Sequence, residues 1–129
     1  MDPSDVRRNN EDAVAECEKG DLIEFPRKKF GGSVSHWAAY VGRGRVIHFT
    51  GENKMSAKIQ EDRFWDVVGD SVAIINNYLD GEKDVPPREK IVENARSKLG
   101  TTGYDAARNN CEHFATWCRY GVKWSQQVC

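Results

Sequence analysis

The stretch Ser35-His36-Trp37-Ala38-Ala39-Tyr40-Val41-Gly42-Arg43-Gly44-Arg45-Val46-Ile47-His48-Phe49-Thr50 decides the fold of this chain. Two runs within and beside it, residues 34–41 and 45–50, are rich in aromatic and β-branched side chains, which favour strands. Between the runs lies Gly42-Arg43-Gly44, a combination typical of a turn. The pattern predicts two antiparallel strands joined as a hairpin.

The length of the hairpin loop decides where its two histidines point. If residues 42–44 form a three-residue loop, Ala38 pairs with His48, and His36 is a diagonal neighbour on the same face, roughly 7–8 Å away between backbones. A two-residue loop would place the two imidazoles on opposite faces. Gly44 can take the left-handed conformation that a three-residue loop requires. The sequence therefore permits convergent imidazoles in one register only.

Outward from the hairpin, predicted strands come before predicted helices. One strand is expected at 22–25, ended by Pro26, and another at 72–78, while residues 58–68 fit a strand or an irregular segment. Two helices are expected, at 88–99 and from about Asn110 to Gly121. Their predicted buried residues are Ile91, Val92, Ala95 and Leu99 in the first, and Phe114, Trp117 and Cys118 in the second. This order indicates an α+β domain with a small antiparallel sheet packed with helices.

Length and charge suit one soluble domain. The 129 residues carry 19 Lys and Arg against 20 Asp and Glu, a net charge of −1, which argues against nucleic-acid binding through bulk charge and against a polybasic membrane anchor. We expect a ragged segment at 1–19 with a short helix over 11–18, a folded domain at 20–121 and a tail at 122–129. The first twenty residues lack the apolar run of a secretory signal, so we expect a cytoplasmic protein.

The cysteines are expected to be thiols. Cys17, Cys111, Cys118 and Cys129 include no C-x-x-C pair. Cys111 and Cys118 would lie about 10 Å apart along one helix, too far for a disulfide. A reducing compartment is therefore expected.

Cys111 and the hairpin histidines are candidates for nucleophilic catalysis. A thiol at a helix start is favoured as thiolate by the helix dipole, and the backbone N–H groups there can stabilise an oxyanion. A helix-start cysteine with a strand-borne histidine is the papain-like arrangement. His113 is a poor base for Cys111, because residues i and i+2 of a helix point in different directions.

Other interpretations remain open at this point. Cys111 can be a core residue, and the two histidines can be hydrogen-bonded strand residues. Zinc could be bound by His36, His48, Cys111 and His113, but closely spaced ligand pairs are missing. The basic run 27–29 could meet a phosphate, although a short charged run is more often solvated, and the asparagines 109–110 can simply cap a helix.

Five strings of the sequence resemble the lecithin:retinol acyltransferase-like family, in particular its small phospholipase A/acyltransferases, the HRAS-like suppressor group. The strings are Gly20-Asp21-Leu22-Ile23-Glu24-Phe25, Ser35-His36-Trp37-Ala38-Ala39-Tyr40-Val41-Gly42, Val46-Ile47-His48-Phe49, Asn110-Cys111-Glu112-His113-Phe114 and Arg119-Tyr120-Gly121. They span most of the chain, and an Asn-Cys-Glu-His-Phe string after two spaced histidines is the most specific of them.

The resemblance implies a circularly permuted papain-like fold of the NlpC type. It implies Cys111 as the nucleophile, His36 as the general base, His48 as the residue that orients or supports the base, and Asn110 as an oxyanion or supporting residue. The reaction implied is acyl transfer from a glycerophospholipid ester through a thioester, with water, an amine or an alcohol as acceptor. It implies no cofactor or metal. Many relatives carry a C-terminal hydrophobic anchor that has no counterpart in these residues, so we expect either peripheral membrane contact or an anchor that has been removed.

Two competing functions use the same residues. A papain-like amidase or peptidase would share Cys111, His36 and His48, and the polar composition suits soluble substrates. A non-catalytic interaction domain with the same fold would be expected to lack one catalytic residue, and none of the three is missing.

Overall fold

The computed structural model describes residues 1–29, 32–53, 55–102 and 111–126. The elements follow in the order α1 (Pro3–Glu16), β1 (Leu22–Lys29), β2 (Gly32–Gly42), β3 (Arg45–Thr50), β4 (Lys58–Arg63), α2 (Phe64–Val68), β5 (Ile74–Ile75), α3 (Arg88–Ser97) and α4 (Cys111–Tyr120). Within the described residues, five antiparallel strands form one open sheet in the order β4-β3-β2-β1-β5. The predicted α+β class with a small antiparallel sheet is confirmed.

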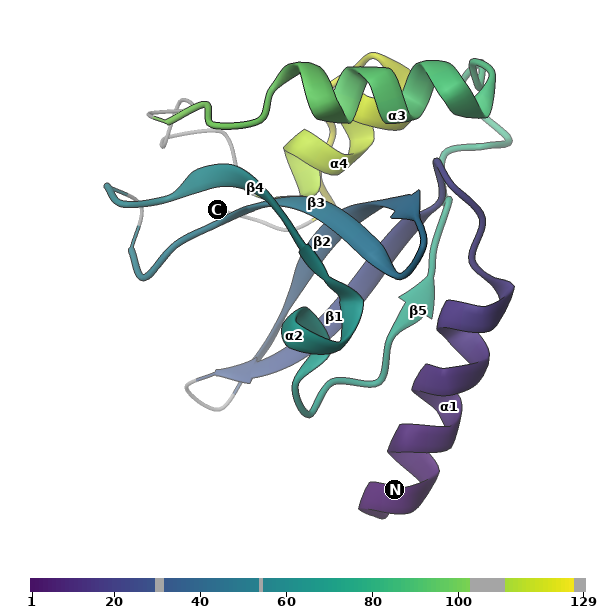
Figure 1. Ribbon diagram of the computed structural model, residues 1–129, viewed down its shortest axis with the longest axis vertical. Coiled ribbons are helices and arrows are strands. Elements are labelled where there is room, and N and C mark those ends of the chain that lie inside the picture. Colours follow the sequence, from purple (N-terminus) through teal and green to yellow (C-terminus); the bar gives the residue numbers. More distant parts are fainter. Residues whose placement is uncertain (30–31, 54, 103–110, 127–129) are drawn as a thin grey trace.

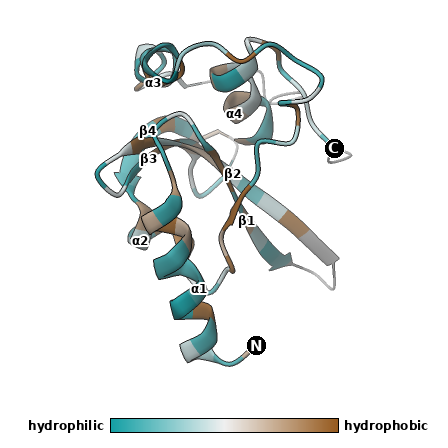
Figure 2. Cartoon of the chain, turned by 90° about the vertical axis from the view of Figure 1, so that its right-hand side faces the viewer, coloured by the Kyte–Doolittle hydropathy of each residue, from teal (hydrophilic) through white to brown (hydrophobic). Residues whose placement is uncertain are grey.

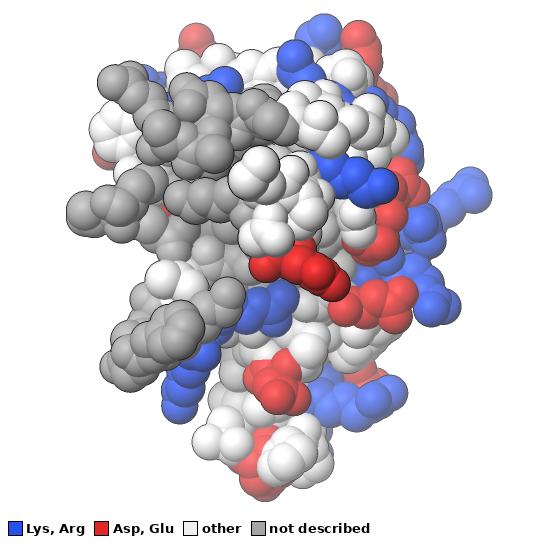
Figure 3. Space-filling model, turned by 90° about the vertical axis from the view of Figure 1, so that its left-hand side faces the viewer, with Lys and Arg blue, Asp and Glu red and all other residues white. Residues whose placement is uncertain are grey.

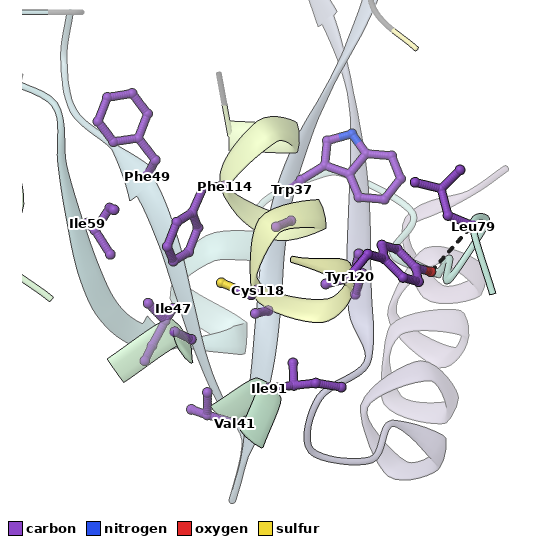
Figure 4. Packing of buried hydrophobic residues seen from close by; sticks show 14 of the residues in the cluster. Trp37, Val41, Ile47, Phe49, Ile59, Leu79, Ile91, Phe114, Cys118 and Tyr120 are labelled. Carbon is purple, nitrogen blue, oxygen red and sulfur yellow. Dashed lines mark hydrogen bonds between the residues drawn. The ribbon is translucent and has the colours of Figure 1, made fainter. Parts of the chain in front are cut away.

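Helices cover both faces of the sheet (Figure 1). On one face, α3 and α4 pack against side chains from the four longer strands, with Trp37, Ile47 and Phe114 among the fully buried residues (Figure 4). On the other face, α1 and α2 pack against a second cluster that includes Ile23 and Phe25. Hydrophobic residues gather where the strands cross beneath α3 and α4, whereas α1 is mostly hydrophilic (Figure 2).

The β2–β3 hairpin reaches the predicted register by a different route. Its turn has two residues, Arg43 and Gly44, both left-handed with φ 55° and 73°, as in a type I′ turn. A β-bulge between Tyr40 and Gly42 adds one unpaired residue, so that Tyr40 pairs with Val46 and Ala39 with Ile47. The predicted three-residue loop is therefore wrong. The extra residue of the bulge nevertheless gives the same strand register, and the same face for each side chain, as that loop would have given.

The N-terminal segment is more regular than predicted. Helix α1 begins at Pro3, because the Asp2 carboxylate accepts hydrogen bonds from the backbone N–H groups of Ser4 (2.8 Å) and Asp5 (3.2 Å), a strong N-cap. The buried Asn10 side chain ties the helix to the chain before β5: its Nδ2 donates to the Ser71 carbonyl, and its Oδ1 accepts from the Ala73 N–H, both at 2.9 Å.

Two predicted strand limits are wrong for identifiable reasons. Pro26 does not end β1. The strand on that edge of β1, β5, pairs only with Ile23 and Glu24. The missing N–H of Pro26 therefore removes no hydrogen bond between strands on that edge. Conversely, the strand predicted at 72–78 shrinks to the two residues of β5. The segment 58–68, left open by the sequence, divides into β4 and the short helix α2.

The helix predicted at 88–99 ends earlier, at Ser97. Ile91 and Ala95 are fully buried and Val92 is half-buried, as predicted, but Leu99 is 42% exposed. In α4, Phe114 and Cys118 are fully buried and Trp117 is half-buried, as expected.

A buried arginine connects α4 to the start of β1 and to the loop before α3. Arg119 donates through Nε and Nη2 to the two carboxylate oxygens of Asp80, at 2.9 and 2.8 Å, and through Nη1 to the Gly20 carbonyl at 2.8 Å. The Tyr120 hydroxyl donates to the same carboxylate at 2.6 Å. A bidentate pair of this kind fixes both position and orientation.

Basic and acidic side chains are interspersed on the face shown in Figure 3, in keeping with the small net charge. Among the described residues, no helix combines the length and the apolar character needed to cross a bilayer.

Candidate active site

The two hairpin histidines lie on the same face of the sheet and are hydrogen-bonded to each other. His36 Nε2 lies 2.7 Å from His48 Nδ1, and the ring centroids are 5.0 Å apart in an edge-on arrangement. Phe25, which pairs with His36 across β1 and β2, supports the His36 ring at a centroid distance of 6.1 Å. The predicted convergence of these imidazoles is confirmed.

A carboxylate that the sequence did not point to continues this chain of contacts. Asp62 on β4 lies 2.7 Å from His48 Nε2 through Oδ2, and the same oxygen accepts from Gln60 Nε2 at 2.5 Å. Burial by itself raises the pKa of Asp62, but the hydrogen bonds from His48 and Gln60 outweigh burial and hold the pKa below its ordinary value. Asp62 is therefore an anion at neutral pH.

The order of the protons along this chain follows from charge. Burial lowers the pKa of His48 despite the opposing contact with Asp62, so His48 is neutral at pH 7 and carries one ring proton. The carboxylate can only accept, which assigns that proton to His48 Nε2. His48 Nδ1 must then accept from His36 Nε2–H.

Cys111 is the first residue of α4, and its sulfur lies against the strand that carries His36. Sγ is 3.7 Å from the Ser35 carbonyl oxygen, and the backbone N–H of Trp37 also interacts with the sulfur. His36 is the residue between these two contacts. The pairing of β2 with β3 ends at Ala39 and Ile47. The start of α4 therefore contacts β2 at residues that are not paired with β3.

The predicted lowering of the Cys111 pKa is wrong in direction. Burial raises the pKa of the Cys111 thiol to about 11, although the backbone N–H groups of Trp37, Cys111 and Glu112 act in the opposite sense. The helix start does favour the thiolate as predicted, but desolvation of a half-buried sulfur is the larger effect. The Cys111 side chain is consequently a neutral thiol at pH 7.

Alkylation by iodoacetamide tests this protonation state. A thiol with a pKa near 11 has about one part in 10⁴ as thiolate at pH 7, so its alkylation rate should rise about tenfold per pH unit up to that pKa. Peptide-resolved mass spectrometry should show Cys111 reacting faster than Cys17, whose pKa burial raises to about 12. A pH-independent rate at Cys111 between pH 6 and 9 would instead indicate a preformed thiolate.

Glu112, the second residue of α4, is fully buried. Its carboxylate accepts from the Tyr78 hydroxyl at 2.5 Å, from Ser125 Oγ at 2.9 Å and from the Gln126 N–H at 3.0 Å. These contacts connect the first turn of α4 to Tyr78, which precedes the helix in the chain, and to Ser125 and Gln126, which follow it. They hold the backbone of Cys111 in place.

Arg27 is the second residue whose position the sequence did not give. It lies in β1 instead of in a solvated basic loop, and it donates to the carbonyls of Val67 (2.6 Å) and Val68 (2.8 Å) and to Ser71 Oγ (2.7 Å). Burial lowers the pKa of Arg27, and the negative charge of a Cys111 thiolate would oppose this shift. Arg27 also adds to the effect of burial in lowering the pKa of His48, so its positive charge acts on the histidine pair.

Several predicted features cannot be placed or are not brought together. Asn110 and Cys129 lie outside the described residues, while Cys17, Cys111 and Cys118 carry free thiols. In the described part of the chain, no group of three or more His, Cys, Asp or Glu side chains has a geometry that could hold a metal ion. Nε2 of His36 is instead hydrogen-bonded to Nδ1 of His48, and Nε2 of His48 to Asp62.

Comparison with known proteins agrees with the resemblance seen in the sequence. The model of the family described as lecithin retinol acyltransferase matches residues 15–124. Human Phospholipase A and acyltransferase 4 is 35% identical, over 88% of this chain and 76% of that protein, and human Phospholipase A and acyltransferase 3 is 32% identical, over 89% and 78%. Mouse Lecithin retinol acyltransferase is 29% identical, over 94% and 62%. The chain therefore belongs to the lecithin retinol acyltransferase family.

Proposed function

We propose that this protein is a thiol-dependent acyltransferase and phospholipase A that acts on glycerophospholipid esters through a thioester on Cys111. The observation that carries the proposal is the His36–His48 hydrogen bond of 2.7 Å, on the strand against which the Cys111 sulfur lies. The names of the relatives supply the reaction class and the lipid substrate. The helix-start cysteine, in contact with a histidine-bearing strand, supports a circularly permuted papain-like fold.

In the first half-reaction, His36 removes the Cys111 proton as the sulfur attacks the ester carbonyl. The thiol pKa of about 11 makes this transfer necessary at neutral pH, and we assign it to Nδ1 of His36, because Nε2 is hydrogen-bonded to His48. A carbon–sulfur bond forms, and the carbonyl oxygen becomes an oxyanion. When the carbon–oxygen ester bond breaks, His36 returns the proton to the leaving lysophospholipid, and the acyl group remains on the sulfur as a thioester.

In the second half-reaction, an acceptor takes the acyl group. His36 removes a proton from water, an amine or an alcohol as its oxygen or nitrogen attacks the thioester carbonyl. The carbon–sulfur bond then breaks, and His36 protonates Cys111 again. Hydrolysis and acyl transfer thus share every step except the identity of the acceptor.

Backbone N–H groups at the start of α4 are suited to stabilise the oxyanion. Those of Cys111 and Glu112 already interact with the sulfur, and they sit at the positive end of the helix dipole. We assign Asn110, just before the nucleophile, a supporting or oxyanion role as well. His48 orients His36 through its ring.

A covalent adduct is the direct test of this proposal. Wild-type protein mixed with phosphatidylcholine micelles and quenched in acid within seconds should gain the mass of one acyl chain. Peptide mapping should locate that mass on Cys111. The Cys118→Ala variant, which removes another thiol of the same helix, should gain the same mass, and Cys111→Ala should gain none. Ester cleavage without any adduct on Cys111 would contradict the thioester route.

A further inference from the structure

We propose that Asp62 is a positioning residue that sets the proton order of the His36–His48 pair and so selects which nitrogen of His36 acts as the base. This inference rests on the proposed function for its catalytic consequence. The proton order itself can be measured without catalysis.

The register of β3 and β4 places Asp62 where it can act. His48 pairs with Gln60 and Val46 with Asp62, so Asp62 is the diagonal neighbour of His48 on the face that carries both histidines. His48 is only 3% exposed, and its Nε2 meets the Asp62 carboxylate at 2.7 Å. Gln60 Nε2 donates to the same oxygen, which holds the carboxylate toward the ring.

A row of two neutral imidazoles has two possible proton orders. In one, His48 carries its proton on Nε2 and accepts at Nδ1 from His36 Nε2–H, which leaves His36 Nδ1 without a proton. In the other, His48 carries its proton on Nδ1 and donates to His36 Nε2, so that His36 must hold its own proton on Nδ1. Only the first order leaves His36 Nδ1 able to take the proton of Cys111.

The Asp62 carboxylate selects the first order because it has no proton to donate. The second order would set two acceptors, His48 Nε2 and Asp62 Oδ2, against each other at 2.7 Å, where the imidazole is buried and the carboxylate is partly exposed, which is unfavourable. The negative charge also stabilises the imidazolium that forms when His36 has taken the thiol proton. Asp62 thereby acts on the base through His48 and need not touch the substrate.

Other charged groups face the pair from the neighbouring strands. Arg27 of β1 acts electrostatically on His48, and Arg45 of β3 acts on Asp62. Glu61, next to Asp62 in β4, points to the opposite face and pairs with Arg45 at 2.6 Å and Arg96 at 2.5 Å. Glu61 is therefore a matched control: it is a carboxylate on the same strand with two ion pairs and no bond to His48.

The test compares Asp62→Ala with Glu61→Ala in two measurements. In a Cys111→Ala background labelled with ¹⁵N-histidine, the imidazole nitrogen shifts report which nitrogen of each ring is protonated, and His113→Gln assigns the third histidine. We expect protonated Nε2 on His36 and His48 in the parent and in Glu61→Ala, and a mixture of proton orders in Asp62→Ala. If Asp62→Ala does not fold, Asp62→Asn removes the charge at constant shape and carries the same measurements.

The kinetic measurement uses the whole 129-residue chain with phosphatidylcholine. We expect Asp62→Ala to lower kcat about 10- to 100-fold with little change in KM, because Asp62 acts on the base, His36, only through His48. The acid limb of the kcat/KM profile should move to lower pH, since loss of the carboxylate makes the histidine pair less basic. Asp62→Glu should recover part of the rate, and Glu61→Ala should change neither quantity.

Unchanged ¹⁵N shifts in Asp62→Ala would overturn the proposal, as would a rate loss that Glu61→Ala reproduces. Failure of the proposed function gives a different result. In that case the wild-type protein forms no acyl adduct, while the ¹⁵N shifts still respond to Asp62 and the assigned proton order stands.

Discussion

Replacing Cys111 by alanine is expected to lower kcat/KM for phosphatidylcholine cleavage by about a thousandfold to a millionfold, and His36→Ala should lower it nearly as far. The reason is that the resting thiol, with a pKa of about 11, is a poor nucleophile at pH 7 without a base. A base without the sulfur has nothing to activate. The double variant should therefore be no worse than either single variant.

Release of labelled fatty acid, with and without an added amine acceptor, measures both outcomes of the reaction. Cys118→Ala is the control, since it removes a thiol of the same helix that lies within the hydrophobic core. Equal fatty-acid release by Cys111→Ala and the wild type would remove the catalytic proposal. Additive losses in the double variant would show that His36 and Cys111 do not act as a unit.

His48→Ala gives a graded version of the same experiment. If His48 only orients His36, its removal should cost less than loss of the base. A loss as large as that of His36→Ala would assign His48 a direct part in proton transfer.

The second large effect concerns stability. We expect Arg119→Ala to lower the free energy of unfolding by about 3 kcal/mol, because the arginine is 4% exposed. Its loss removes two of the hydrogen bonds to the Asp80 carboxylate, which keeps the one from the Tyr120 hydroxyl, and the hydrogen bond to the Gly20 carbonyl. The partial exposure of Asp80, at 42%, lets water recover some of that loss. Urea denaturation followed by tryptophan fluorescence measures the change.

Arg63→Ala is the matched control for this prediction. Arg63 also pairs with an aspartate, Asp66, at 2.9 Å, but its side chain is 70% exposed. Its removal should change the free energy of unfolding by about 0.5 kcal/mol or less. A similar small change for Arg119→Ala would mean that the buried pair adds little to stability.

What the sequence could predict depended on local pattern. The hairpin and α4 were recognisable because glycines and aromatic or β-branched runs mark them within short windows. The facing histidines followed from the period of two along a strand. The extent of α1 depended on Asp2 acting as a cap, and such a cap has an effect only if the helix finds a partner, which here is the chain around Ser71.

What the sequence could not predict depended on the pairing of distant strands. Asp62 lies in a polar run, Lys58–Arg63, in which alternation is weak, so nothing local shows that it faces His48. The partners of Arg27 are carbonyls at the end of α2, which lie far from β1 along the chain, so no local pattern indicates them. The pKa of Cys111 was misjudged because desolvation depends on the surrounding atoms of the folded protein, whereas the helix dipole can be inferred from position alone.

The single extra residue near the tip of the β2–β3 hairpin constrains how this protein can change in evolution. Losing or gaining one amino acid there would rotate every side chain of one strand to the other side of the sheet, separating the imidazoles and exposing core residues together. Length variation at this tip is tolerable only in steps of two, or when a compensating change occurs in the same ribbon. Homologues with loops of different length at this position should therefore show even-numbered differences.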